Sequence, residues 1–268
     1  MFPARPSPIC TAIDWSGDAT EAGQRRKIVA ATVRDGCVTE VVAGRTRPEV
    51  AHWLASTARR ADSDGAPIFV GFDFSFSLPE WFARSNGSRS IDDVWALVGE
   101  RGEEWLRECA PPFWGRQSTQ CTLGPPEQFR QCEHRLRALR RRPKSIFQIG
   151  GPGAVGTGSL RGMPWLAWLR ARGVAVWPFD DAGACTALEV YPSLFASVAT
   201  NDRDGRAAHL STAPAAVLGA ADRAVAIASD DAFDAVVSAL AMWERRAELL
   251  ALEATTDATT ALEGATWI

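Results

Sequence analysis

Four short acidic motifs constrain how this chain can fold, because each follows an apolar strand-like run or opens a helix. The motifs are Ile13-Asp14-Trp15-Ser16-Gly17, Gly71-Phe72-Asp73, Leu188-Glu189-Val190-Tyr191-Pro192 and Asp231-Ala232-Phe233-Asp234-Ala235. Two carboxylates about 4 Å apart repel by about 4 kcal/mol at an effective dielectric constant near 20. A fold that gathers these acids therefore needs cations among them, and oxygen ligands without histidine favour Mg²⁺ or Mn²⁺.

The first third of the chain predicts a three-stranded meander followed by a helix. Asp35-Gly36 separates the strand-like runs Lys27 to Val33 and Cys37 to Val42, and Asp-Gly is a strong hairpin signal because both residues tolerate positive φ. Thr46 and Glu49 then fit a capping box, which predicts that a helix begins there.

Two of the acids follow predicted strands directly. Ile9 to Ile13 is apolar and ends at Asp14, and the continuously apolar run Pro67 to Phe72 ends at Asp73. A continuous apolar run is typical of a strand that is buried on both faces. A carboxylate in such a place costs several kcal/mol unless it is paired or bound to a metal.

The middle of the chain predicts a large insertion, because Asp73 and Glu189 are 116 positions apart and a crossover between neighbouring parallel strands needs far fewer. We assign residues 75–172 to a mostly helical insertion within a single domain that spans residues 1–268. Its predicted helices are Leu78 to Ala83, Ile91 to Val98, Gly102 to Cys109, Pro126 to Leu139 and Met163 to Ala171. A glycine-rich loop, Gly150 to Gly158, lies between the last two.

The strongest helical pattern runs from Ser229 to about Leu250, with Ser229 or Asp230 as its cap. Asp231 and Asp234 are three positions apart, so both can address one point. Asp230 is interpreted as a structural acid that interacts with the helix dipole.

Composition is compatible with a globular protein. The 29 basic and 32 acidic residues almost balance, so contact with a polyanion requires a local basic patch. Six scattered cysteines without a C-x-x-C pair, and no secretory leader pattern, predict a cytoplasmic protein with reduced thiols. No stretch approaches a membrane span, and the three histidines are too dispersed for a structural zinc site.

The order of these elements resembles the ribonuclease H-like fold, and the Asp231-Ala232-Phe233-Asp234-Ala235 opening is similar to the final catalytic helix of the Holliday-junction resolvase branch. More closely, the four motifs together resemble the domain-of-unknown-function 429 family of predicted ribonuclease H-like nucleases, over nearly the whole chain. The resemblance implies an α/β fold with a mixed five-stranded sheet flanked by helices, and the insertion between the fourth and fifth core strands.

The resemblance also implies a two-metal hydrolysis of phosphodiester bonds in DNA or RNA. The resolvase pattern carries over to Asp14, Asp73, Asp231 and Asp234 as catalytic acids and ligands of Mg²⁺ or Mn²⁺. Glu189 has no counterpart there, and it joins the predicted ligands through the E-x-Y-P motif of the closer family, with an ion pair to an arginine as the alternative. No protein nucleophile is expected.

Substrate binding is assigned to a basic run in the insertion, which holds six cations and no acid in ten residues: Arg135, Arg137, Arg140, Arg141, Arg142 and Lys144. Such a run can neutralise several phosphates, although basic residues also favour a solvated helix end. Phe113, Trp114 and Phe147 were candidates for stacking on unpaired bases, with core packing as the alternative. The glycine-rich loop lacks the pattern of a P-loop.

Two other functions remain open at this point. One is an actin-like ATP-dependent phosphotransferase, which also places carboxylates on magnesium but normally duplicates the domain. The other is a nucleic-acid-binding protein of the same fold without catalytic activity. Neither a membrane partner nor a particular oligomeric state is predicted.

Overall fold

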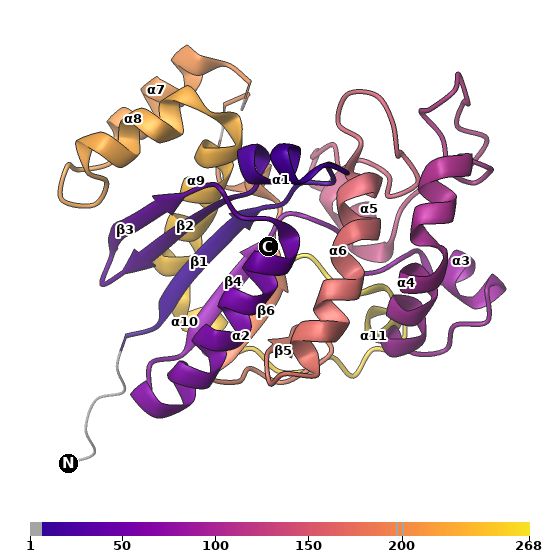
Figure 1. Ribbon diagram of the computed structural model, residues 1–268, viewed down its shortest axis with the longest axis horizontal. Coiled ribbons are helices and arrows are strands. Elements are labelled where there is room, and N and C mark those ends of the chain that lie inside the picture. Colours follow the sequence, from indigo (N-terminus) through magenta and orange to yellow (C-terminus); the bar gives the residue numbers. More distant parts are fainter. Residues whose placement is uncertain (1–6, 197, 200) are drawn as a thin grey trace.

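The computed structural model describes residues 7–196, 198–199 and 201–268. Its centre is a mixed six-stranded sheet of order β3-β2-β1-β4-β6-β5 (Figure 1). The strands are β1 (Ile9–Asp14), β2 (Val29–Arg34), β3 (Cys37–Val42), β4 (Ile68–Phe72), β5 (Ala175–Val176) and β6 (Cys185–Glu189). β1, β2 and β3 pair antiparallel, whereas β4, β6 and β5 continue parallel to β1. The prediction of an α/β fold with a mixed sheet is confirmed, but five strands was one too few, because the two-residue β5 extends the sheet beyond β6.

The helices before the last third of the chain are α1 (Glu21–Lys27), α2 (Arg47–Asp64), α3 (Glu80–Ser85), α4 (Ile91–Glu108), α5 (Gln131–Ala138) and α6 (Val155–Arg170). The later ones are the 3₁₀ turn η1 (Pro192–Leu194), α7 (Arg203–Ser211), α8 (Ala220–Ala228), α9 (Asp230–Glu244), α10 (Arg246–Leu249) and α11 (Thr260–Glu263). Within the described residues, no helix is both long and apolar enough to span a membrane.

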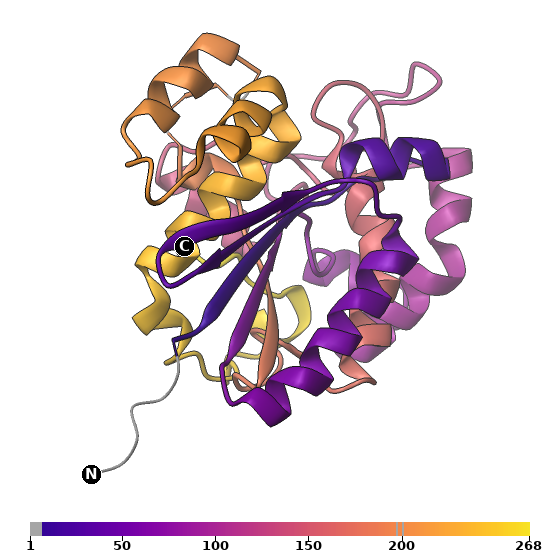
Figure 2. The same ribbon diagram turned by 60° about the vertical axis from the view of Figure 1, so that its left-hand side comes forward.

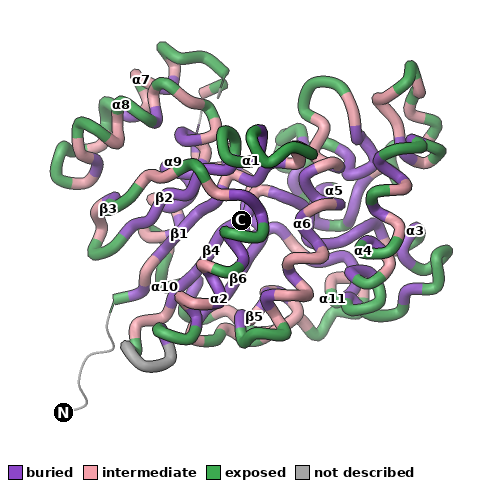
Figure 3. Tube along the Cα trace, in the orientation of Figure 1, coloured by how far each residue is buried: buried purple, intermediate pink, exposed green. Residues whose placement is uncertain are grey.

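Helices cover both faces of the sheet (Figure 2). On one face, Phe233 and Val236 of α9 belong to the same buried cluster as Ala12 of β1. On the other, Leu54 of α2 and Leu166 of α6 share a cluster with alternate strand residues. Figure 3 shows that the buried part of the chain concentrates in the central strands and the helices that pack on them. Side chains therefore alternate between two cores along each strand, as expected from the period of two.

The region between β4 and β5 contains α3, α4, α5 and α6, in agreement with the mostly helical insertion that we assigned to residues 75–172. Two of the predicted segments merge into the single helix α4, whose Gly102 is buried rather than a break. The glycine-rich loop is shorter than predicted, because α6 begins at Val155. The division into one domain with an insertion stays a prediction.

Local signals in the first third of the chain correspond to the structure. Asp35 and Gly36 both have positive φ in the β2–β3 hairpin, at 48° and 79°. Thr46 and Glu49 form the capping box of α2, and Ser229 caps α9 by accepting a hydrogen bond from the Ala232 amide. No disulfide bond joins the cysteines among the described residues. Helices α1, α7 and α8 were not predicted; α1 is only seven residues long and depends on its Thr20 cap.

Candidate functional site

Asp14 and Asp73 lie side by side at the carboxyl ends of two neighbouring parallel strands. β1 pairs with β4 in a register that places Ile13 opposite Phe72, so one further step brings Asp14 next to Asp73. Ile13 and Phe72 belong to the core beneath α2 and α6. Because successive side chains alternate between faces, both aspartates are directed to the opposite face, which α9 covers.

The first turns of α9 bring Asp231 and Asp234 to the same place. α9 packs across β1 and β2, and its Ser229 cap fixes where the helix begins. Gly71 allows this approach, since a Cβ atom there would lie 2.7 Å from Sδ of Met242 in α9. Asp14, Asp73, Asp231 and Asp234, which we call the acid cluster, therefore lie near one another where β1, β4 and α9 meet. Their role as catalytic acids and metal ligands stays a prediction.

The acid cluster perturbs its own protonation. Burial, followed by repulsion from Asp73 and Asp231, raises the pKa of Asp14 well above its usual range. Burial also raises the pKa of Asp73 to about 7, although the hydrogen bond from the Trp15 amide opposes this change. The pKa of Asp234 rises to about 8, through burial and then repulsion from Asp73.

Asp231 is the least perturbed of the four. Burial and the neighbouring Asp230 raise its pKa to about 6, and Lys27 lowers it. Asp230 itself is exposed at the start of α9, which agrees with its interpretation as a helix-dipole residue. Burial and mutual repulsion thus disfavour the ionised forms of these carboxylates in the folded protein.

The four acids are oxygen donors, the ligand type that Mg²⁺ and Mn²⁺ prefer. In the part of the chain that the structure describes, no lysine or arginine forms an ion pair with any of the four acids. Oδ1 of Asp234 is buried without a hydrogen-bond partner, and such an atom is costly unless something binds it. Among the described residues, however, no three His, Cys, Asp or Glu side chains are arranged so as to hold a metal ion already. The four carboxylates of the acid cluster are close enough to repel one another, but no three of them are arranged around a common ion position.

The loop after Asp14 is held rigidly by the insertion and by α2. A Cβ atom on Gly17 would lie 2.5 Å from the Gly158 amide nitrogen of α6, so only glycine fits. The guanidinium of Arg47 donates to the carbonyl of Ser16, at 2.8 Å, and Arg161 of α6 donates to the carbonyl of Gly17. These contacts explain the Ser16-Gly17 part of the motif structurally. Sequence reasoning did not identify either arginine, because nothing in the local pattern marks their distant partners.

Glu189 does not join the acid cluster. β4 and β6 pair with Phe72 opposite Glu189, and side chains opposite each other in a parallel pair share a face. Glu189 therefore projects on the Phe72 side, whereas Asp73 is on the other. Its carboxylate accepts two hydrogen bonds from the buried guanidinium of Arg130, at 2.6 and 2.9 Å.

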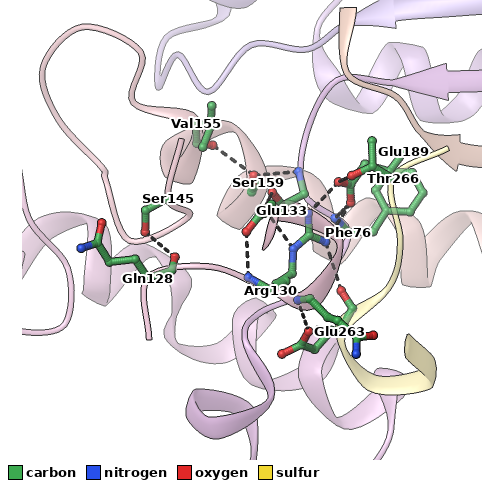
Figure 4. A network of polar contacts seen from close by, with 12 residues as sticks. Phe76, Gln128, Arg130, Glu133, Ser145, Val155, Ser159, Glu189, Glu263 and Thr266 are labelled. Atoms are coloured by element: carbon green, nitrogen blue, oxygen red, sulfur yellow. Dashed lines mark hydrogen bonds and ion pairs between the residues drawn. The ribbon is translucent and has the colours of Figure 1, made fainter. Parts of the chain in front are cut away.

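Two further donors complete the surroundings of Glu189, namely the Phe76 amide at 2.8 Å and the Thr266 hydroxyl at 2.7 Å (Figure 4). Each carboxylate oxygen thus accepts two hydrogen bonds, which leaves no lone pair for a metal. The predicted role of Glu189 as a ligand is not supported by this geometry. The signal that could have identified its role is the register of β6, which the sequence pattern alone does not provide.

The basic run lies close to the acid cluster. A cavity of about 50 Å³ is lined by Lys144 together with Asp73, Glu189 and Tyr191. The six basic side chains are exposed, and Arg141 donates to the carbonyl of Ser193, directly beyond the E-x-Y-P motif. Arg137 lies over the ring of Phe129, at 4.5 Å.

The three aromatic residues proposed for base stacking belong to the protein interior instead. Phe113 and Phe147 are 2% and 0% exposed and pack with Phe82 and Trp105. Trp114 is partly buried and packs against the same core. Core packing, the alternative to base stacking, is therefore confirmed for these rings.

A larger cavity, of about 510 Å³, lies elsewhere, between the C-terminal segment and Trp177. None of the four clustered acids lines it. Of the carboxylates that do, Glu248 pairs with Arg245, Asp257 accepts hydrogen bonds from Thr260 and Glu253 is exposed. No protein-family model matches the chain, and comparison with curated proteins and with solved structures gave no significant match to either.

Proposed function

We propose that this protein is a divalent-metal-dependent nuclease, which hydrolyses phosphodiester bonds of DNA or RNA at the acid cluster. The observation that carries the proposal is the buried Oδ1 of Asp234, which has no hydrogen-bond partner and lies within a group of carboxylates that form no ion pair with a described lysine or arginine. An uncompensated cluster of this kind opposes folding, and a functional requirement for cations explains why it is present. The ribonuclease H-like assignment is part of the proposal.

Asp14, Asp73, Asp231 and Asp234 would hold Mg²⁺ or Mn²⁺ through oxygen ligands. When bound, such ions would supply a nucleophilic water of lowered pKa and stabilisation of the leaving oxygen. The protein fixes Asp73 through the Trp15 amide, which donates to Oδ1 at 2.7 Å. The other oxygen of the Asp73 carboxylate, Oδ2, would be left for a cation.

The exposed basic side chains near Asp73 favour a polyanionic substrate. Lys144 shares a cavity with Asp73, so a phosphate that contacts this lysine is also next to the acids. The exposed arginines before Lys144 extend the positive surface away from the cluster. A polyanion that crosses this surface would bring one phosphodiester to the acids, and the chain's net charge of −3 provides no general attraction elsewhere.

Metal-induced stabilisation tests the first step. We expect Mn²⁺ to raise the melting temperature of the wild-type protein and to have little effect on an Asp14→Asn/Asp231→Asn variant, because binding to the native state alone stabilises it. Equal shifts in both proteins would exclude a metal site at the cluster.

Cleavage assays test the second step. Single-stranded, duplex and branched DNA and RNA are incubated with Mg²⁺ or Mn²⁺, and Asp73→Asn is expected to abolish any cleavage. ATP hydrolysis without cleavage of nucleic acid would favour the phosphotransferase instead. Tight binding of nucleic acid with neither activity would favour the non-catalytic alternative.

A further inference from the structure

A buried arginine connects the basic run to the segment that carries Asp73. Arg130 immediately precedes α5 and is 0% exposed. Its guanidinium has five N–H groups, and the structure gives it five contacts (Figure 4). Two go to Glu189, two to Oε1 of Glu133 at 2.9 and 3.1 Å, and one to the carbonyl of Glu263 at 3.1 Å.

The acceptors of Arg130 hold the chain just beyond Asp73. Glu189 accepts a hydrogen bond from the Phe76 amide at 2.8 Å, and Glu133 accepts one from the Ser75 hydroxyl at 3.3 Å. The Ser75 amide in turn donates to Oγ of Ser159 in α6. The two residues that follow Phe74 are therefore fixed by side chains that Arg130 itself orients.

The same network fixes the start of the helix that leads into the basic run. The Arg130 amide donates to Oε2 of Glu133 at 2.9 Å, which closes a capping arrangement at the first turn of α5. The Gln131 amide donates to the carboxylate of Glu263 at 2.6 Å. α5 is thus anchored at its N-terminal end, and its exposed C-terminal end passes into Arg140, Arg141 and Arg142.

The charges around Arg130 favour a role for this residue in positioning its neighbours over a role in stabilising the fold alone. One guanidinium faces two buried carboxylates, and burial is the main reason that the pKa of Glu133 is raised. Buried ion networks are often no more stabilising than apolar residues of the same volume, whereas their directional contacts define one arrangement. At Arg130, that arrangement relates β4, β6, α5 and the C-terminal segment.

We infer that Arg130 is a positioning residue, which through Glu189 and Glu133 sets the segment 74–76 behind Asp73 and orients the basic run relative to the acid cluster. This inference rests on the proposed function of the cluster. It also reassigns Glu189, which acts through Arg130 and the Phe76 amide rather than as a ligand.

The test uses a charge-neutral variant, Arg130→Met/Glu133→Gln/Glu189→Gln, because removal of Arg130 alone leaves two buried carboxylates unpaired and can prevent folding. Arg130→Lys is the conservative variant, which retains the charge but not the five-donor geometry. The control is Arg101→Met/Glu104→Gln, which removes an exposed pair on α4 with side-chain exposures of 41% and 34%.

Two readouts separate the possible results. Hydrogen exchange of the metal-free proteins reports on residues 73–76 and 131–144, and a Mn²⁺ titration followed by melting temperature gives the midpoint of metal binding. We expect faster exchange in both segments of the neutral variant and a Mn²⁺ midpoint raised by about tenfold, with Arg130→Lys intermediate and the control unchanged.

An unchanged Mn²⁺ midpoint in a folded neutral variant, or unchanged exchange in both segments, would overturn the inference even if the melting temperature falls. If the wild-type protein itself shows no response to Mn²⁺, the proposed function fails. The exchange measurement then still decides whether Arg130 orders residues 73–76, because it requires neither metal nor substrate.

Discussion

The backbone amide of Trp15 donates a hydrogen bond of 2.7 Å to Oδ1 of Asp73. This contact joins the residues that directly follow β1 and β4, and it makes the orientation of one acid depend on the backbone next to the other. The ring of Trp15 packs edge-on against Phe72, with centroids 5.5 Å apart. Contacts within the protein thus hold the ends of β1 and β4 together.

Asp234→Asn is expected to raise the melting temperature of the metal-free protein and to reduce its stabilisation by Mn²⁺. The substitution removes a carboxyl group whose ionised form is disfavoured by burial and by Asp73, so the metal-free protein becomes more stable. It also removes one of the proposed ligand oxygens, so the stabilisation by Mn²⁺ decreases. The measurement is thermal unfolding in a chelator and then in Mn²⁺.

Asp222→Asn provides the matched control, because Asp222 is also an acid in the first turn of a helix, α8. The Asp222→Asn variant should be slightly less stable than wild type, because it loses a favourable interaction with the helix dipole. Its increase in melting temperature with Mn²⁺ should equal that of wild type. A metal-free Asp234→Asn protein that is less stable than wild type would contradict the view that the cluster is repulsive.

Stability of the metal-free protein should increase as the pH falls from about 8 to about 5. The pKa values of Asp73, Asp231 and Asp234 are raised to about 7, 6 and 8, so in this window the folded state binds more protons than the unfolded state. Unfolding free energy therefore decreases with rising pH. Melting temperatures measured across this range in a chelator should show the trend, by at least about 2 °C.

Mn²⁺ should flatten or reverse that dependence, since metal ions require the ionised carboxylates. The Asp14→Asn/Asp231→Asn variant serves as the comparison, because fewer coupled acids remain. A melting temperature that instead rises with pH in the chelator would mean that the acids are stabilised as anions by contacts of their own.

The sequence was sufficient to predict the strand ends and the helix that carry the acid cluster, because each depends on a local signal. The apolar runs before Asp14 and Asp73 predicted buried strands, and the Ser229 cap with the following apolar stripe predicted α9.

Glu189 was assigned to the metal ligands because the sequence pattern does not show which face of the sheet it is on. That face depends on the pairing of β6 with β4, which is a long-range property. Arg130 was missed for the same reason: two of its three buried partners, Glu189 and Glu263, come from segments more than fifty residues away. The helices α7 and α8 are only nine residues long each, and α8 packs on α9 while α7 packs on α8.

Gly17→Ala is expected to destabilise the protein by roughly 1–3 kcal/mol, as overpacking commonly does. The added methyl group would meet backbone atoms of Thr157 and Gly158 at 2.6 and 2.5 Å, which cannot rotate away. Gly99→Ala in α4 is the control, since no atom lies within 4 Å of its added Cβ and alanine favours a helix by about 0.5–1 kcal/mol.

Urea unfolding of both variants measures the two effects. Because Gly17 lies on the loop after Asp14, the alanine variant should also show a weaker response to Mn²⁺, whereas Gly99→Ala should not. If Gly17→Ala were as stable as wild type, the close contact between this loop and α6 would be wrong.

Replacement of Arg140, Arg141 and Arg142 by glutamine should weaken binding of single-stranded nucleic acid and flatten its dependence on salt. Each phosphate contact contributes a slope of about −0.7 in a plot of log K against log salt concentration for single strands, so three lost contacts would reduce the slope by about 2. Binding is measured by fluorescence anisotropy with a labelled oligonucleotide in Ca²⁺ or without metal.

The control replaces Arg59, Arg107 and Arg203, three exposed arginines on helices elsewhere in the protein, and changes the net charge equally. A similar loss in both triple variants would show that overall charge, rather than this segment, determines binding.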